Sequence, residues 1–171
     1  MNTDLKRKLG LWDGVHVDYL KELYNANSSS IAFFENLVKL CIDEKDLQIS
    51  TTWLIKHHYD NRQKLPEHLT EKLLDTSKNL ERWEAKLHLL QLVPHFNLTD
   101  NSIIITDDFV RECLIDSNKF VRAWAYNALY ELTKYIPELK SELEFMCHKA
   151  METESEAIKS KVRKILLELN K

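Results

Sequence analysis

Histidines are the side chains of this chain best suited to metal chemistry, and their spacing is unfavourable for it. His57 and His58 are adjacent, and neighbouring side chains on a helix point about 100° apart, so this pair alone cannot hold one metal ion. Glu84 and His88 stand four residues apart, a spacing at which two side chains bond along one helix. The chain has no His-Glu-x-x-His and no Cys-x-x-Cys segment. The sequence therefore predicts no metal site.

The cysteines are the next candidates, as nucleophiles or ligands. Cys41, Cys113 and Cys147 follow no ligand spacing, and each lies among apolar residues of an expected helix. We expect reduced, buried thiols in an intracellular protein. A glycine-rich phosphate loop is excluded because the chain has only two glycines, which are isolated. The sequence thus predicts no catalytic residue and no cofactor.

The composition predicts that helices alone carry these residues. The chain of 171 residues has two glycines and three prolines, too few for the turns of many short strands, and it is rich in helix-forming Ala, Leu, Glu and Lys. Apolar periodicity predicts helices over residues 15–26, 31–42, 47–59, 66–74, 80–93, 106–115, 121–134, 137–151 and 155–169. We expect an all-α fold of one domain.

The longest expected break covers residues 94–106. It contains Ser102 followed by Ile103, Ile104 and Ile105, a run with β propensity. We expect a loop that packs the three isoleucines under the next helix, with a two-stranded excursion as the alternative.

A helix pair recurs along the chain. Second helices that start at residues 47, 81, 121 and 158 are 34, 40 and 37 residues apart. Three aligned columns are small or apolar in almost every copy: Thr51, Ala85, Ala125 and Val162; Ile55, Leu89, Leu129 and Leu166; His58, Leu92, Leu132 and Leu169. They form one buried stripe at positions i, i+4 and i+7. Glu81 and His88 do not fit, and a one-residue slip would turn Leu80 and Leu87 inward instead. Period and pattern predict a helical solenoid.

The segment from Leu114 to Leu132 resembles the HEAT or armadillo-like family of α-solenoids. The matching residues are Leu114, Asp116, Val121, Arg122, Ala125, Ala128, Leu129 and Leu132. The resemblance implies a right-handed α-α superhelix of about four HEAT-like hairpins, with residues 1–30 as N-terminal capping helices and residues 31–171 as the repeats of a single domain, 1–171.

In that family an Asp in the turn pairs with an Arg early in the second helix. The pairs that fit this ladder are Asp116 with Arg122 and Asp75 with Arg82. The end repeats depart from it, with Asp43 and Gln48 in the first, and Lys159 with Glu154 or Glu156 in the last.

The resemblance also implies that the second helices line a concave surface. The two columns expected there read Gln48, Arg82, Arg122, Lys159 and Thr52, Lys86, Tyr126, Arg163, of which five of eight are basic. Trp124 lies between Arg122 and Tyr126, and Tyr130 follows one turn later. The candidate binding residues are Arg82, Lys86, Arg122, Tyr126, Lys159, Arg163, Trp124 and Tyr130.

Two interpretations of these residues remain open. The basic ridge either binds an anionic partner, or consists of ladder arginines and an ordinary solvated face. The tryptophans Trp53, Trp83 and Trp124 either contact a partner or fill gaps between repeats.

The leading functional hypothesis is a non-catalytic binding module or scaffold that holds a protein or peptide, for example an acidic one, in its concave face. The alternative is a nucleic-acid-binding protein related to the DNA alkylation repair glycosylases, which resemble it in having HEAT-like repeats and a basic, Trp-lined face. The family's catalytic Asp and aromatic cluster could not be matched to positions of this chain. A third hypothesis is self-association through residues 155–169, which leaves the oligomeric state open. A net charge of −3 does not identify a partner. Without a signal peptide or an apolar run of about 20 residues, we expect a cytoplasmic protein with no membrane partner.

Overall fold

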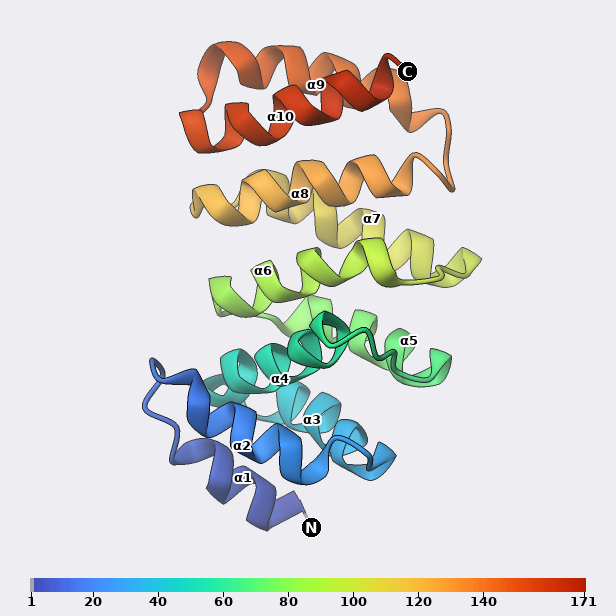
Figure 1. Cartoon of the computed structure of the whole chain (residues 1–171). Coiled ribbons are helices and arrows are strands. Elements are labelled where there is room, and N and C mark those ends of the chain that lie inside the picture. Colours follow the sequence, from blue (N-terminus) through green and yellow to red (C-terminus); the bar gives the residue numbers. More distant parts are fainter. Residues whose placement is uncertain (1) are drawn as a thin grey trace. The chain divides into compact units, whose positions relative to one another are not determined.

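The computed structural model describes residues 2–171, and within this range it contains α-helices, short 3-10 helices and no strand (Figure 1). The α-helices are α1 (Asn2–Gly10), α2 (Val17–Asn27), α3 (Ile31–Asp43), α4 (Gln48–Asp60), α5 (Glu67–Asp75), α6 (Trp83–Leu92), α7 (Asp100–Leu114), α8 (Lys119–Leu132), α9 (Leu139–Thr153) and α10 (Glu156–Leu169). The 3-10 helices are η1 (Lys45–Leu47), η2 (Thr76–Asn79) and η3 (Val93–His95). The all-α prediction is confirmed.

The helices form two compact units. The first unit ends at Leu92 and contains α1 to α6, and the second begins at Val93 and contains α7 to α10. Each unit buries its own set of Leu, Val, Ile and Phe side chains. The single-domain organisation stays a prediction, and the two units are described separately below.

In the first unit, first helices of the hairpins pack on first helices, and second helices pack on second helices. The hairpin partners α3 and α4 pack on each other, α3 also packs on α5, and α4 also packs on α6. The first helices of successive hairpins thus contact each other, and so do the second helices, which is how a helical repeat buries its faces. The N-terminal helix α2 covers α4. In the second unit the hairpins α7–α8 and α9–α10 are joined mainly through α8, which packs on both α10 and α9.

The predicted register of the second helices is confirmed. The column of Ala125 is fully buried in all four helices, and of the other two columns only Leu166 and Leu169 are half-buried. Ala85 and Leu89 are both 0% exposed and Leu87 is half-buried, so the predicted register holds within α6. Leu80, which lies before α6, is buried as the one-residue slip would place it. Glu81 is exposed because α6 begins two residues later, at Trp83.

The prediction of a loop over residues 94–106 is wrong for its second half, which is helical. The helix α7 begins at Asp100, after Thr99 accepts a hydrogen bond from the Ser102 backbone N–H and the Ser102 hydroxyl accepts one from the Thr99 N–H. This capping box uses Ser where Glu or Gln is usual. The isoleucine run is helical, and Ile104 is 63% exposed rather than packed under a helix. Tertiary context and a good cap here outweigh the β propensity of three branched residues.

Candidate functional site

Gln48 is the first residue in the first column of the expected concave ridge. In the structure its side chain is buried and hydrogen-bonds to the turn before α6. Its side chain is 0% exposed at the start of α4. The Nε2 atom donates to the Asn79 carbonyl at 2.7 Å, and Oε1 accepts from the Glu81 and Arg82 backbone N–H groups at 2.9 and 3.2 Å. These two N–H groups directly precede α6, where a helix has no internal partners for its first donors. Gln48 therefore caps the next repeat's second helix.

Arg82 pairs with a different acid from the one the ladder pattern predicts. Its guanidinium donates to Asp46 Oδ1 at 2.8 Å, in the preceding repeat. Its predicted partner, Asp75, instead lines a groove between α3 and α5. A second ion pair, Lys45 with Glu81, joins the same two turns. The ladder here runs between repeats, from the turn before α4 to the turn before α6, and both side chains of the Arg82 pair are largely exposed.

Arg122 is the most completely engaged residue of the ridge. Its Nε and Nη2 atoms donate to the two carboxylate oxygens of Glu154 at 3.0 and 2.9 Å, and Nη1 donates to the main-chain carbonyls of Asp116 and Ser117. The Asp116 carboxylate accepts from the Asn118 N–H. Hydrogen bonding to Glu154 raises the pKa of Arg122, and the same bonds lower the pKa of Glu154. Such a bidentate pair is among the strongest polar contacts in proteins.

The remaining ridge residues divide between ion pairs and the core. Lys159 and Arg163 both face Glu156, at 3.8 and 3.0 Å. Lys86 is half-buried. Tyr126 is only 7% exposed, and burial raises its pKa. Its expected place on an open surface is therefore wrong, because its ring belongs to the core of α8. The positive ridge is neutralised by carboxylates at four positions, Arg82, Arg122, Lys159 and Arg163, which favours the ladder interpretation.

Replacing Arg122 with alanine tests that interpretation. We expect the free energy of unfolding to fall by about 2 kcal/mol, less than for a fully buried pair because both side chains keep about a fifth of their surface exposed. The double variant R122A/E154A should recover part of this loss, because no unpaired carboxylate remains. Urea denaturation of wild type, R122A, E154A and R122A/E154A gives the coupling energy between the two side chains. A coupling energy of zero would return Arg122 to the list of candidate binding residues.

The second helices of the second unit form a small hollow that no sequence column predicts in full. The α8–α10 face is defined by Trp124, Asn127 and Tyr130 on α8 and by Lys161 and Lys164 on α10. Asn127, Tyr130, Ile165 and both lysines line a hollow of about 120 Å³ together with two carboxylates, Glu131 and Glu168. These two carboxylates form ion pairs with Lys134 and Lys171. The Lys161 ammonium lies 3.5 Å from the centroid of the Trp124 ring. Of these residues, sequence reasoning named only Trp124 and Tyr130.

Lys161 and Lys164 carry charge that the chain itself does not neutralise. Among the described residues neither ammonium lies within ion-pairing distance of a carboxylate. Burial, and then repulsion by Lys164, lower the pKa of Lys161. The Trp124 ring face partly stabilises this cation, as aromatic quadrupoles do. The face therefore has an aromatic wall beside two ammonium groups without an ion-pair partner, while the two carboxylates of the hollow, Glu131 and Glu168, already pair with Lys134 and Lys171.

The histidines of the first unit lie in an aromatic cluster rather than in a metal site. The Trp53 ring stacks on His57 with centroids 4.8 Å apart, and the Tyr24 ring meets His57 edge-on. The Tyr24 hydroxyl bonds to His58 Nδ1 at 3.0 Å. Burial lowers the pKa of both histidines, which favours their neutral forms. Within residues 2–171 no three His, Cys, Asp or Glu side chains come together as metal ligands would.

The cysteines are buried free thiols, as predicted. Burial raises the pKa of Cys41, and raises that of Cys147 to about 12. A thiol with so high a pKa is protonated at neutral pH and is a poor nucleophile.

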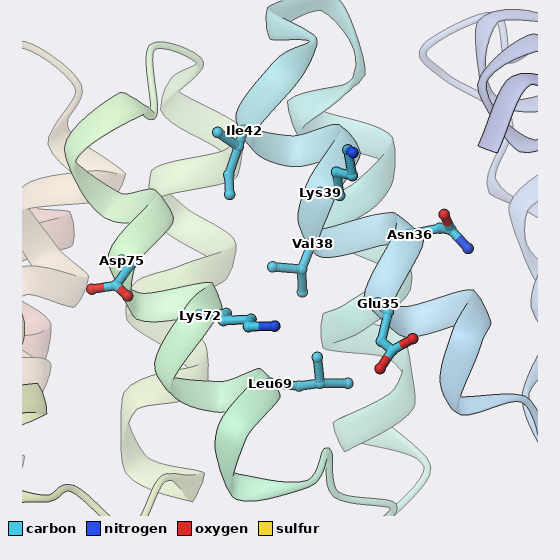
Figure 2. A pocket seen from close by; sticks show the side chains of 8 residues that line it. All are labelled: Glu35, Asn36, Val38, Lys39, Ile42, Leu69, Lys72 and Asp75. Carbon is cyan, nitrogen blue, oxygen red and sulfur yellow. The ribbon is translucent and has the colours of Figure 1, made fainter.

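Another hollow lies in the first unit, between the first helices α3 and α5. It has a volume of about 630 Å³ and is lined by residues from both helices (Figure 2). Sequence reasoning missed it, because it assigned the first helices no role beyond packing. The only signal in the sequence was the mixture of apolar and charged residues on one side of residues 31–42.

The comparison with protein families agrees with this architecture. The model of a HEAT repeat domain matches residues 8–169. The chain belongs to the HEAT repeat family. HEAT repeats commonly mediate interactions between proteins. No curated protein and no solved structure matches the chain. No helix within residues 2–171 of this HEAT repeat protein has the length and apolar character needed to cross a bilayer.

Proposed function

We propose that this HEAT repeat protein is a non-catalytic binding module, and that its α8–α10 face holds an acidic segment of a partner protein. The observation that carries the proposal is the Lys161 ammonium over the Trp124 ring, beside a hollow and without a carboxylate partner. An incoming Asp or Glu side chain would complete this arrangement with a charge-assisted hydrogen bond.

The chemistry of the face supports a protein segment as the occupant. Trp124 and Tyr130 are aromatic side chains of the kind that dominate binding energy at protein interfaces. Lys161 and Lys164 select for negative charge next to these anchors. By contrast, the basic residues Arg82, Arg122, Lys159 and Arg163 already pair with carboxylates of this chain. A partner would have to break those pairs before it could use them.

Because these four basic residues already pair with carboxylates, nucleic acid is a less suitable partner than an acidic protein segment. Binding to a phosphate backbone relies on several cations that release counterions together. The α8–α10 face offers two such cations in the second unit. A role without catalysis is supported by the protonated thiols and the neutral, aromatic-packed histidines described above.

Selection from a random library of 12-residue peptides tests the proposal. The wild-type chain should enrich sequences with Asp or Glu next to a large apolar residue. The charge-reversed variant K161E/K164E should bind the selected peptides at least tenfold more weakly, in line with about 1.5–3 kcal/mol for a hydrogen bond to a charged group. Fluorescence anisotropy of the labelled peptides measures the affinities.

The variant K140E/K149E is the matched control, because both lysines are exposed on α9 and the change in net charge is the same. It should bind like wild type. Equal binding by wild type and K161E/K164E, or enrichment of basic peptides, would contradict the proposal. A salt-dependent gel shift of duplex DNA, lost in K161E/K164E, would favour the nucleic-acid alternative.

A further inference from the structure

Lys161 takes part in two neighbouring features of the α8–α10 face. Its ammonium group lies 3.5 Å from the centroid of the Trp124 ring, and the residue also lines the hollow. Trp124 does not line the hollow, although Asn127, about one helical turn further along α8, does. One lysine side chain therefore covers a face of the half-buried indole ring and also borders the hollow beside it.

The ammonium group competes with any apolar side chain for this face of the Trp124 ring. A cation over an indole ring is held strongly enough to change a binding constant by roughly two- to thirtyfold. An apolar group that stacks on the covered face must displace the ammonium group and cannot bond to it. A carboxylate can, because it accepts a charge-assisted hydrogen bond from the displaced cation.

The surroundings of Lys161 leave its ammonium group available to a carboxylate from outside the chain. Glu131 and Glu168 line the hollow, but each pairs with the lysine three residues after it. Burial, and then repulsion by Lys164, disfavour the charged form of Lys161 and lower its pKa. A cation in such a place gains more from an added carboxylate than a fully solvated lysine does.

We propose that Lys161 is a gate over Trp124: a carboxylate of the partner segment draws the ammonium group off the ring, and the uncovered ring face then binds an apolar side chain of the same segment. The gate rests on the function proposed above, because it needs an acidic segment on the α8–α10 face. The charge-assisted hydrogen bond described there forms as the Lys161 side chain turns from the ring toward the hollow. Recognition of charge and recognition of the apolar group are thereby coupled, so Lys161 determines specificity as well as affinity.

Removal of the Lys161 side chain tests the gate in peptide binding. An acidic peptide selected by the wild-type chain is compared with a copy in which Gln replaces the acidic residues. We expect K161A to bind the Gln copy about threefold more tightly than wild type does, or better, because the ring is then permanently uncovered. A lysine that only binds the carboxylate predicts no such gain. The matched control K164A removes the same charge from the same face without uncovering Trp124, so it should not gain affinity for the Gln copy.

The position of the Lys161 side chain in the wild-type complex is a second, direct readout. In the free protein the ring current of Trp124 should shift the ε-methylene protons of Lys161 upfield, because they lie next to the ring face. Saturation with the selected acidic peptide should bring these signals to the position of an exposed lysine such as Lys140, whereas the Gln copy at the same concentration should leave them shifted. Proton–carbon NMR of protein with labelled lysines measures the signals, and K161A identifies the one from Lys161.

Two results overturn the gate. One is a ring-current shift that persists in the saturated complex, and the other is a Gln copy that binds K161A no better than wild type. Lys161 would then be a fixed ligand of the carboxylate or a permanent link between α8 and α10. Circular dichroism checks that K161A stays folded, and the NMR experiment on the wild-type complex decides if it does not. Failure of the proposed function gives a different result, in which no acidic peptide is enriched or K161E/K164E binds like wild type, and the gate is then overturned as well.

Discussion

Replacing Gln48 with alanine is expected to lower the free energy of unfolding by about 3 kcal/mol. The side chain is fully buried and makes three hydrogen bonds to the turn before α6. Removing it leaves the Asn79 carbonyl and the Glu81 and Arg82 N–H groups without partners, and each such group costs about 1–3 kcal/mol when it stays away from water. The lower end of that range applies because Glu81 and Arg82 lie at an exposed turn.

Urea denaturation of Q48A gives the loss of stability, and hydrogen exchange locates it. The amide protons of Glu81 and Arg82 should exchange faster in Q48A, while those of α9 should be unchanged. Q48M keeps the shape of the side chain but has no amide group, so it should lose nearly as much stability as Q48A. The control variant Q63A removes an exposed glutamine and should lose little. If the stability of Q48A stays within about 0.5 kcal/mol of wild type, Gln48 does not act as the cap of α6.

The second large effect is a loss of stability of the first unit as the pH falls from about 6.5 to about 4. Burial, together with repulsion by Lys56, lowers the pKa of His88 to about 4. Its Nδ1 atom lies 2.9 Å from the Thr52 hydroxyl, which also lies 2.6 Å from the Gln48 carbonyl. A hydroxyl has one proton, so when Thr52 donates to the Gln48 carbonyl, the neutral His88 ring donates from Nδ1.

The direction of the pH effect follows from the two states of His88. In the unfolded chain the ring has a pKa near its ordinary value of 6.5, and in the folded chain the pKa is about 4. Between these values the unfolded state binds a proton that the folded state does not bind, so lower pH favours unfolding. Stability is fully present above pH 6.5, and the loss approaches about 3 kcal/mol near pH 4. His57 and His58 have lowered pKa values for the same reason and act in the same direction.

Urea denaturation at several pH values between 7 and 4.5 measures this effect, with fluorine-labelled tryptophans as local probes. Trp53 and Trp83 report on the first unit, and Trp124 reports on the second. The variant H88N keeps a donor near Thr52 but does not titrate, so its stability should depend less on pH. H68N changes an exposed histidine and should keep the wild-type slope. A slope in H88N as steep as in wild type would show that other groups cause the loss.

The repeat pattern was readable from the sequence because it is local and periodic. The columns of Ala125 and Leu129 need only the spacing of small and apolar residues along one helix, and the register that they predict is confirmed by burial. The start of α7 was missed because the signal there, Thr99 with Ser102, is a weak form of a capping box and lies before a run of branched residues. Spacing reports which face of a helix is apolar, but it reports poorly where a helix begins.

The ion-pair partners of the charged residues, by contrast, could not be predicted from the sequence pattern. Arg82 and Arg122 were correctly expected at the start of second helices, yet their acceptors are Asp46 and Glu154, each in a neighbouring repeat's turn. The partner of a long side chain depends on which turns come within a few ångströms of each other. No periodicity in one helix contains that information.

The chain's own sequence was sufficient to determine an all-helical fold, the repeat of helix pairs, the buried stripe of the second helices and the burial of the cysteines, because each follows from residue type and helical period. Tertiary structure alone decided that Gln48 caps α6, that Tyr126 lies in the core, that Lys161 lies over Trp124, and that a hollow lies between α3 and α5. The physical reason is that these features depend on distances between helices far apart in sequence, and such distances result from the packing of whole hairpins.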